Sequence, residues 1–129
     1  MRRQVEAYLD ETYGVTPEML WKDSEAAAVR HNADKKWFGI IMPGIAWRKL
    51  GVDRDGVVDV MNVKCDPVIL PSLIDGQGLF PAYHMNKQHW ISIVLDGSVQ
   101  MEKIMWLLDA SYLLTLKKAK RPKETDKKA

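Results

Sequence analysis

The chain has 129 residues, of which 47% are apolar and 28% charged, and a formal net charge of +2. This length and apolar content suit one compact domain with a single core. The lone Cys65 cannot form an intrachain disulfide, and no apolar signal segment opens the chain, so a reducing, cytoplasmic setting is expected. The longest apolar stretch, 37–47, is interrupted by Gly39 and Pro43 and is too short to span a bilayer, so no membrane role is expected.

Basic residues are concentrated at the C-terminal end of the sequence. Residues 117–129 hold seven Lys or Arg against Glu124 and Asp126, a net charge of +5. The remaining 12 basic and 15 acidic residues give 1–116 a net charge of −3. We therefore expect a domain at 1–116 without a strongly basic face in its bulk charge, followed by a disordered basic tail at 117–129. A solubilising role for this tail is favoured over a nucleic-acid-binding arm.

The first half of the chain predicts one helix and three strands. Apolar residues recur at helical spacing after Arg2, and Gly14 supplies a stop. Strand-forming residues then flank a polar turn, which indicates a hairpin. In chain order, we expect a helix at 2–13, a strand at 26–31, a turn at 31–35, a strand at 36–42, an irregular segment at 43–49 and a strand at 57–64.

The second half predicts two helices and two strands. Asp66 before Pro67 is a good helix start, and Ser98 is expected to cap the closing helix. We expect a short helix at 67–74, a brief strand at 80–83, a central strand at 90–95 and a closing helix whose wide apolar band, which includes Trp106, Leu113 and Leu114, is largely buried. The order of elements predicts an α+β fold, in which helices pack on an antiparallel sheet.

The segment 80–91 gathers two His, a Lys, an Asn and large aromatic residues around one turn. His84 and His89, with Cys65 or Asp66, are conceivable ligands of zinc or iron. The chain lacks Cys-x-x-Cys and His-Glu-x-x-His, however, so hydrogen bonds from the two His to backbone carbonyls are favoured. We expect no metal and no cofactor.

Catalytic chemistry has little support in the residue pattern. Cys65 precedes a predicted helix N-terminus, which would activate a thiol, but a free cysteine is also a small buried apolar residue, and that interpretation is favoured. The sequence has no Gly-rich phosphate loop and no Gly-x-Ser-x-Gly motif. We assign no catalytic residue and expect a protein that is not an enzyme.

Two predicted turns carry residues that suit nucleic acid. Lys35 and Lys36 lie in the first hairpin, and the second turn holds His84, Asn86, Lys87 and His89. Basic side chains neutralise phosphates, and Asn or Lys can reach base edges. The alternative, that both turns are simply solvated, stays open.

Four motifs together resemble the MmcQ/YjbR-like family of small bacterial proteins. They are Lys-Lys-Trp-Phe at 35–38, Val-Lys-Cys-Asp-Pro at 63–67, Pro-Ala-Tyr-His-Met-Asn-Lys-Gln-His-Trp at 81–90, and Asp-Ala-Ser-Tyr at 109–112. Their order and spacing are similar to those of the family from the first helix to about Leu116.

The resemblance implies a CyaY-like α/β sandwich and DNA binding through a double-wing arrangement of two hairpins. It implies that Lys35, Lys36, His84, Asn86, Lys87 and His89 contact the partner. An alternative is a structural latch in which Asp66, His84, Asn86 and Ser111 hold one another. A monomer is favoured.

The frataxin-like fold implies a second function, the binding of a metal or small ligand. Frataxins bind iron through an acidic ridge, and Glu6, Asp10 and Glu11 would place three carboxylates on the first helix. Three acidic residues are few for such a ridge, so DNA binding is the leading hypothesis.

Overall fold

A computed structural model describes residues 1–20 and 25–116, and in these ranges one antiparallel sheet carries two long helices. The helices are α1 (Arg2–Tyr13), η1, a 3-10 helix (Trp47–Leu50), α2 (Leu70–Leu73) and α3 (Met101–Leu114). The strands are β1 (Glu18–Met19), β2 (Ala27–Arg30), β3 (Trp37–Ala46), β4 (Val57–Lys64), β5 (Leu79–Pro81) and β6 (Trp90–Val94). They lie in the order β1-β2-β3-β4-β6-β5.

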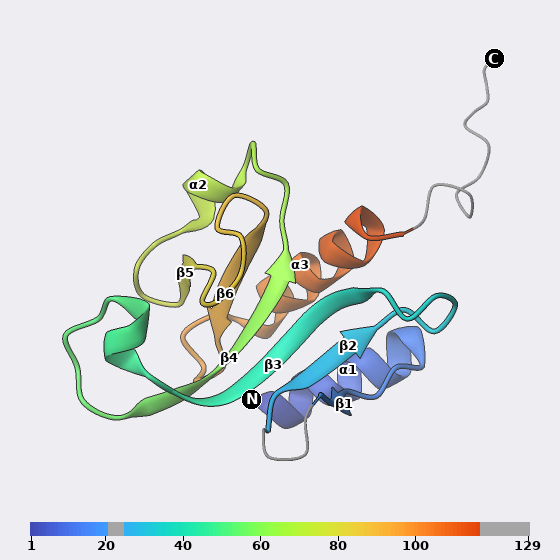
Figure 1. Cartoon of the computed structure of the whole chain (residues 1–129), viewed down its shortest axis with the longest axis horizontal. Helices are drawn as coiled ribbons and strands as arrows, with labels where there is room; N and C mark the ends of the chain where they lie inside the picture. The colour runs from blue at the N-terminus through green and yellow to red at the C-terminus, as the bar shows by residue number, and fades with distance from the viewer. Residues whose placement is uncertain (21–24, 117–129) are drawn as a thin grey trace.

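Both long helices cover the same face of the sheet (Figure 1). Val5 and Leu9 bury one side of α1, which ends where Gly14 adopts the left-handed conformation with φ 64°. Ile104, Leu107 and Leu108 bury one side of α3 against the same core. Helices on a sheet of antiparallel strands make the α+β sandwich that the sequence predicts.

Alternation along the strands gives the sheet two apolar faces. On β4, Met61 and Val63 join the core beneath the helices, whereas Val58 and Val60 pack on the opposite face. Neither α1 nor α3 covers this opposite face, which we call the open face (Figure 1). A second cluster that includes Trp47 and Phe80 forms there instead.

A β-bulge in β3 adjusts which residues reach each face. Arg30 pairs with Trp37 and Val29 pairs with Gly39, so Phe38 is an extra residue in β3. Phe38 therefore enters the helix-covered core, while Trp37 packs on the open face.

Two predicted segments differ from the structure. The prediction that 43–49 is irregular is wrong, because β3 continues to Ala46 through a register shift after Met42, and η1 follows. The short helix expected at 67–74 covers only Leu70–Leu73, although Asp66 Oδ1 does accept a hydrogen bond from Val68 N at 2.9 Å. The two-residue strand β1 was not expected.

The closing helix differs from prediction in its start and in its exposure. Ser98 does not cap it, since its hydroxyl donates to Asp96 Oδ1 at 2.5 Å and α3 begins only at Met101. Trp106 is 50% exposed and Leu113 is 62% exposed, so the apolar band of α3 is wider than the part that the sheet covers. Among the described residues, no helix combines the length and apolar character needed to cross a membrane. The predicted tail at 117–129 lies outside the described ranges.

Two tyrosines of α1 join α3 through one carboxylate. The Tyr8 hydroxyl donates to Asp109 Oδ1 at 2.6 Å, and the Tyr13 hydroxyl donates to the same oxygen. Tyr13 also stacks on Tyr112, with 4.2 Å between the ring centroids. Burial, followed by the hydrogen bond to Asp109, raises the pKa of Tyr8 and of Tyr13 above the usual 10.0.

These raised pKa values predict a loss of stability at alkaline pH. The folded state holds the phenolic protons more tightly, so their contribution is complete below pH 10.0 and falls as the pH rises above it. For Tyr13, the free energy of unfolding should fall by at most about 1.4 kcal/mol per pH unit. Urea unfolding between about pH 9 and 11.5 measures this slope, and Tyr13→Phe should make it shallower. An equal pH slope of the unfolding free energy in the unmodified protein and in Tyr13→Phe would contradict the assignment of this pH dependence to Tyr13.

Candidate nucleic-acid interface

The two basic turns lie at the same end of the sheet. Gly39 of β3 pairs with Val63 of β4, and Lys64 of β4 pairs with Trp90 of β6. The β2–β3 turn and the turn before β6 therefore lie at the same end of the sheet, on either side of the C-terminal end of β4. This end, which we call the basic end, carries Lys35, Lys36, Lys64, Lys87 and His89.

Local hydrogen bonds fix the β2–β3 turn. Lys35 has φ 65°, a left-handed conformation that is uncommon for residues other than glycine, and its N–H donates to His31 O at 2.9 Å. The N–H of Lys36 donates to Asp34 Oδ1 at 3.0 Å. Both lysine side chains are exposed, so the backbone bonds hold the turn while the ammonium groups face solvent.

The second turn is built around Asn86. Its side-chain oxygen accepts from Gln88 N at 2.8 Å, and its backbone oxygen accepts from Trp90 N at 3.0 Å. The backbone oxygen of His89 accepts a hydrogen bond from Cys65 N at 2.8 Å. Asn86 is therefore a turn-forming residue, while Lys87 and the His89 side chain are exposed.

The C-terminal end of α3 contacts the β2–β3 turn of the basic end. His31 Nε2 lies 2.7 Å from Thr115 Oγ1, and the His31 N–H donates to Lys36 O at 2.8 Å. Leu116 borders the same turn, beside Asn32 and Ala33. The sequence segment with a charge of +5 is thus joined to the chain at the end of the sheet that carries the lysines.

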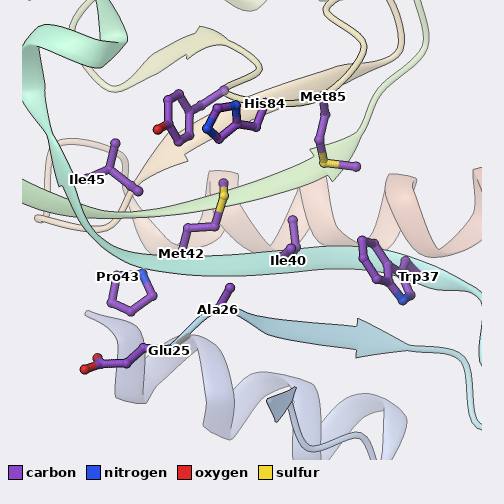
Figure 2. A pocket seen from close by; sticks show the side chains of 10 residues that line it. Glu25, Ala26, Trp37, Ile40, Met42, Pro43, Ile45, His84 and Met85 are labelled. Carbon is purple, nitrogen blue, oxygen red and sulfur yellow. The ribbon is translucent and has the colours of Figure 1, made fainter. Parts of the chain in front are cut away.

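His84 lies apart from the basic end, over the open face. It lines a hollow together with Glu25, Ala26, Trp37, Ile40, Met42, Pro43, Ile45, Tyr83 and Met85 (Figure 2). The imidazole packs against the Tyr83 ring, with 4.0 Å between centroids. Of the six residues expected on one contact surface, Lys35, Lys36, Lys87 and His89 therefore lie at the basic end, His84 lines this hollow, and Asn86 forms the turn between them.

A buried polar pair holds the turn that carries His84. Asn62 and Ser92 are cross-strand partners on β4 and β6, and both are fully buried. Asn62 Nδ2 donates to Tyr83 O at 2.8 Å, Ser92 Oγ accepts from Tyr83 N at 2.9 Å, and Ser92 Oγ donates to Asn62 Oδ1 at 2.5 Å. We call this arrangement the Asn62–Ser92 clamp. This pair was not predicted. The feature of the sequence that could have indicated it is one polar residue within each of two otherwise apolar strands.

The expected latch has different partners. Ser111 Oγ accepts from Lys64 N at 2.8 Å and donates to Phe38 O at 2.6 Å, so it joins α3 to β3 and β4. Asp66 bonds within its own turn, and His84 packs on Tyr83. The bonds of Ser111 and Asp66 and the ring contact of His84 thus run to partners outside the expected latch, which stays a prediction.

The structure also shows where the candidate catalytic and metal-binding residues lie. Cys65 is buried, and burial, followed by the charge of Asp66, raises the pKa of its thiol, which disfavours the reactive thiolate. Glu6 pairs with Arg2 at 2.8 Å on α1. Within residues 1–20 and 25–116, no three His, Cys, Asp or Glu side chains are grouped as metal ligands.

Comparison with known proteins places this geometry in a family. A sequence model of the YjbR family matches residues 10–114. The Bacillus subtilis protein YyaQ, described as uncharacterised, is 40% identical over 115 residues, which cover 88% of this chain and 97% of YyaQ. The uncharacterised Escherichia coli protein YjbR is 50% identical over 32 residues, 25% of this chain and 27% of YjbR.

Solved structures share the fold. A crystal structure of a Pseudomonas syringae protein superposes with a TM-score of 0.84 at 35% identity and covers 90% of this chain and 99% of its own. A Deinococcus radiodurans protein with a DUF419 domain gives a TM-score of 0.69 at 24% identity, over 95% of this chain and 83% of its own, which supports the fold alone. On the family match and the identity to YyaQ, the chain belongs to the MmcQ/YjbR-like family, as its four motifs indicated.

Proposed function

We propose that this protein binds duplex DNA through its basic end and acts as a binding protein rather than an enzyme. The observation that carries the proposal is the placement of two lysine-bearing turns, the end of β4 and the end of α3 at the same end of the sheet. Exposed lysines on neighbouring turns can contact successive phosphates, and phosphate contacts supply most of the affinity of non-specific DNA binding.

The net charge of −3 is a sum over the whole of 1–116, so it does not exclude a locally basic surface. Asp34 Oδ1 accepts the Lys36 N–H, and Asp66 Oδ1 accepts the Val68 N–H. At the opposite end of the sheet, Asp53 and Asp55 pair with Arg48. Seven further basic residues follow Leu116 in the sequence.

A salt series with the full chain tests the proposal. Four lysine–phosphate contacts should give log K a slope of about −3.6 against log salt, so affinity should fall about 100-fold between about 50 and 200 mM salt. Replacing Lys36 or Lys87 by alanine should each lower this slope by about 1 and weaken binding to all sequences alike. Fluorescence anisotropy with two unrelated duplexes measures both quantities.

Lys49→Ala is the matched control. Lys49 is an exposed lysine in η1, beyond the C-terminal end of β3 and therefore at the opposite end of the sheet. Its replacement should leave the slope unchanged. Absence of binding at low salt would reject the proposal, and an unchanged slope in the Lys36 and Lys87 variants would assign any binding to the C-terminal basic segment instead.

A further inference from the structure

The hollow on the open face has the dimensions of a small-molecule site. Its volume is about 370 Å³, within the range of about 300–1,000 Å³ that is typical of ligand pockets. Ile40, Met42 and Ile45 of β3 form its floor, and His84 and Met85 form its opposite wall (Figure 2). Tyr83, which packs against His84, also lines it. It is thus a solvent-open hollow between a strand and a turn.

The lining favours an aromatic ligand. Met42 rises from β3 toward the His84 ring, and the Met85 side chain extends into the same space (Figure 2). Thioethers adapt to irregular shapes and make favourable contacts with aromatic rings. Trp37 closes one end and offers a further ring for stacking or edge-to-face contact. A saturated ligand of the same size would lose these ring contacts.

The polar groups favour a ligand without strong charge. His84 brings a hydrogen-bonding imidazole to the wall, whereas the Glu25 carboxylate points away from the other lining side chains (Figure 2). Among the described residues that line the hollow, none is Lys or Arg. One hydroxyl or amide on the ligand would therefore satisfy the site.

The backbone of the wall is held in a costly conformation. His84 has φ 61°, one of two positive values among the non-glycine residues described, and such conformations persist only where the surroundings enforce them. The Asn62–Ser92 clamp supplies that enforcement by binding both backbone groups of the preceding Tyr83. Side chains buried in two strands thus serve to place Tyr83 and His84 over β3.

From the volume, the lining and the enforced turn, we infer that this hollow binds a small aromatic molecule that carries one uncharged hydrogen-bonding group. The inference is independent of DNA binding, because the hollow contains none of the lysines of the basic end. Affinity for such a ligand should therefore be insensitive to salt.

Titration of the full chain with 2-naphthol tests the inference, with decahydro-2-naphthol, which keeps the skeleton and hydroxyl but lacks the aromatic rings, as the matched probe. Calorimetry should show 2-naphthol binding at least about fivefold more tightly, since ring contacts of this kind contribute on the order of 1 kcal/mol. Nuclear magnetic resonance shifts should be centred on Trp37, Met42 and Met85.

Two blocking variants and one control locate the binding. Ala26→Phe and Ile45→Trp each place a large side chain in the hollow. Each should lower the affinity for 2-naphthol by about tenfold or more, while thermal unfolding stays cooperative. Trp106→Ala removes a half-exposed aromatic residue of α3 and should leave the affinity unchanged. Unchanged affinity in the folded blocking variants, equal affinity for the saturated probe, or shifts centred on Trp106 would each overturn the inference.

Discussion

Replacing Ser111 by alanine should lower the free energy of unfolding by about 2–4 kcal/mol, because it leaves two backbone groups without partners. The hydroxyl accepts the Lys64 N–H and donates to the Phe38 carbonyl, and Ser111 itself is fully buried. Both backbone groups lie where the bulge of β3 meets the end of β4, so water does not readily replace the lost partner. Chemical denaturation of the two proteins measures the difference.

Ser98→Ala is the control for this substitution. Ser98 is exposed and bonds to Asp96 within one turn, so its loss should cost about 0.5 kcal/mol or less. If both substitutions lowered the free energy of unfolding equally, the hydrogen bonds of Ser111 would not stabilise the packing of α3 on the sheet.

Replacing Asn62 by alanine should lower the free energy of unfolding by a similar amount, about 2–4 kcal/mol, for a different reason. The variant leaves the Tyr83 carbonyl unbonded and deprives the Ser92 hydroxyl of its acceptor at a fully buried site. The turn at 83–85 should then loosen, so amide hydrogen exchange of Tyr83 should accelerate more than that of the β4 core. The same variant should weaken 2-naphthol binding, since one wall of the hollow moves.

A double-mutant cycle of Asn62→Ala and Ser92→Ala tests whether the clamp acts as a unit. The two residues share Tyr83 as a partner, so their effects should be non-additive by about 0.5–3 kcal/mol. Asn32→Ala is the matched control, because Asn32 is an exposed asparagine that also donates to backbone carbonyls, those of Tyr13 and Gly14. Strict additivity would show that Asn62 and Ser92 stabilise the fold separately.

Periodicity predicted the elements that bury a regular face. The amphipathic spacing of α1 and the apolar residues of β4 and β6 indicated their type and position, because each repeats one local rule over many residues. Prediction was poorer where tertiary pairing overrides local signals. Pro43 and Gly44 would end an isolated strand, yet β3 continues past them because β4 pairs with Ile45 and Ala46 across the register shift.

The residue types of the candidate site are visible in the sequence, but their arrangement is not. The lysines of both turns were identified because charge is legible in a sequence, and the position of Lys64 between them required the strand register. His84 and Lys87 are three residues apart in sequence, but the turn directs one over the open face and the other to the basic end. Asn62 and Ser92 are 30 residues apart in the sequence, and their roles depend on the pairing of β4 with β6. A single sequence does not specify that pairing.

The outermost strands of the sheet are its shortest. β1 has two residues and β5 has three, and β5 ends in Pro81, which has no N–H to offer. Unpaired strand edges are templates on which other chains can add a strand and aggregate, and short edges and prolines suppress that addition. The long, strongly apolar strands β3, β4 and β6 are therefore shielded on both sides from self-association through strand addition.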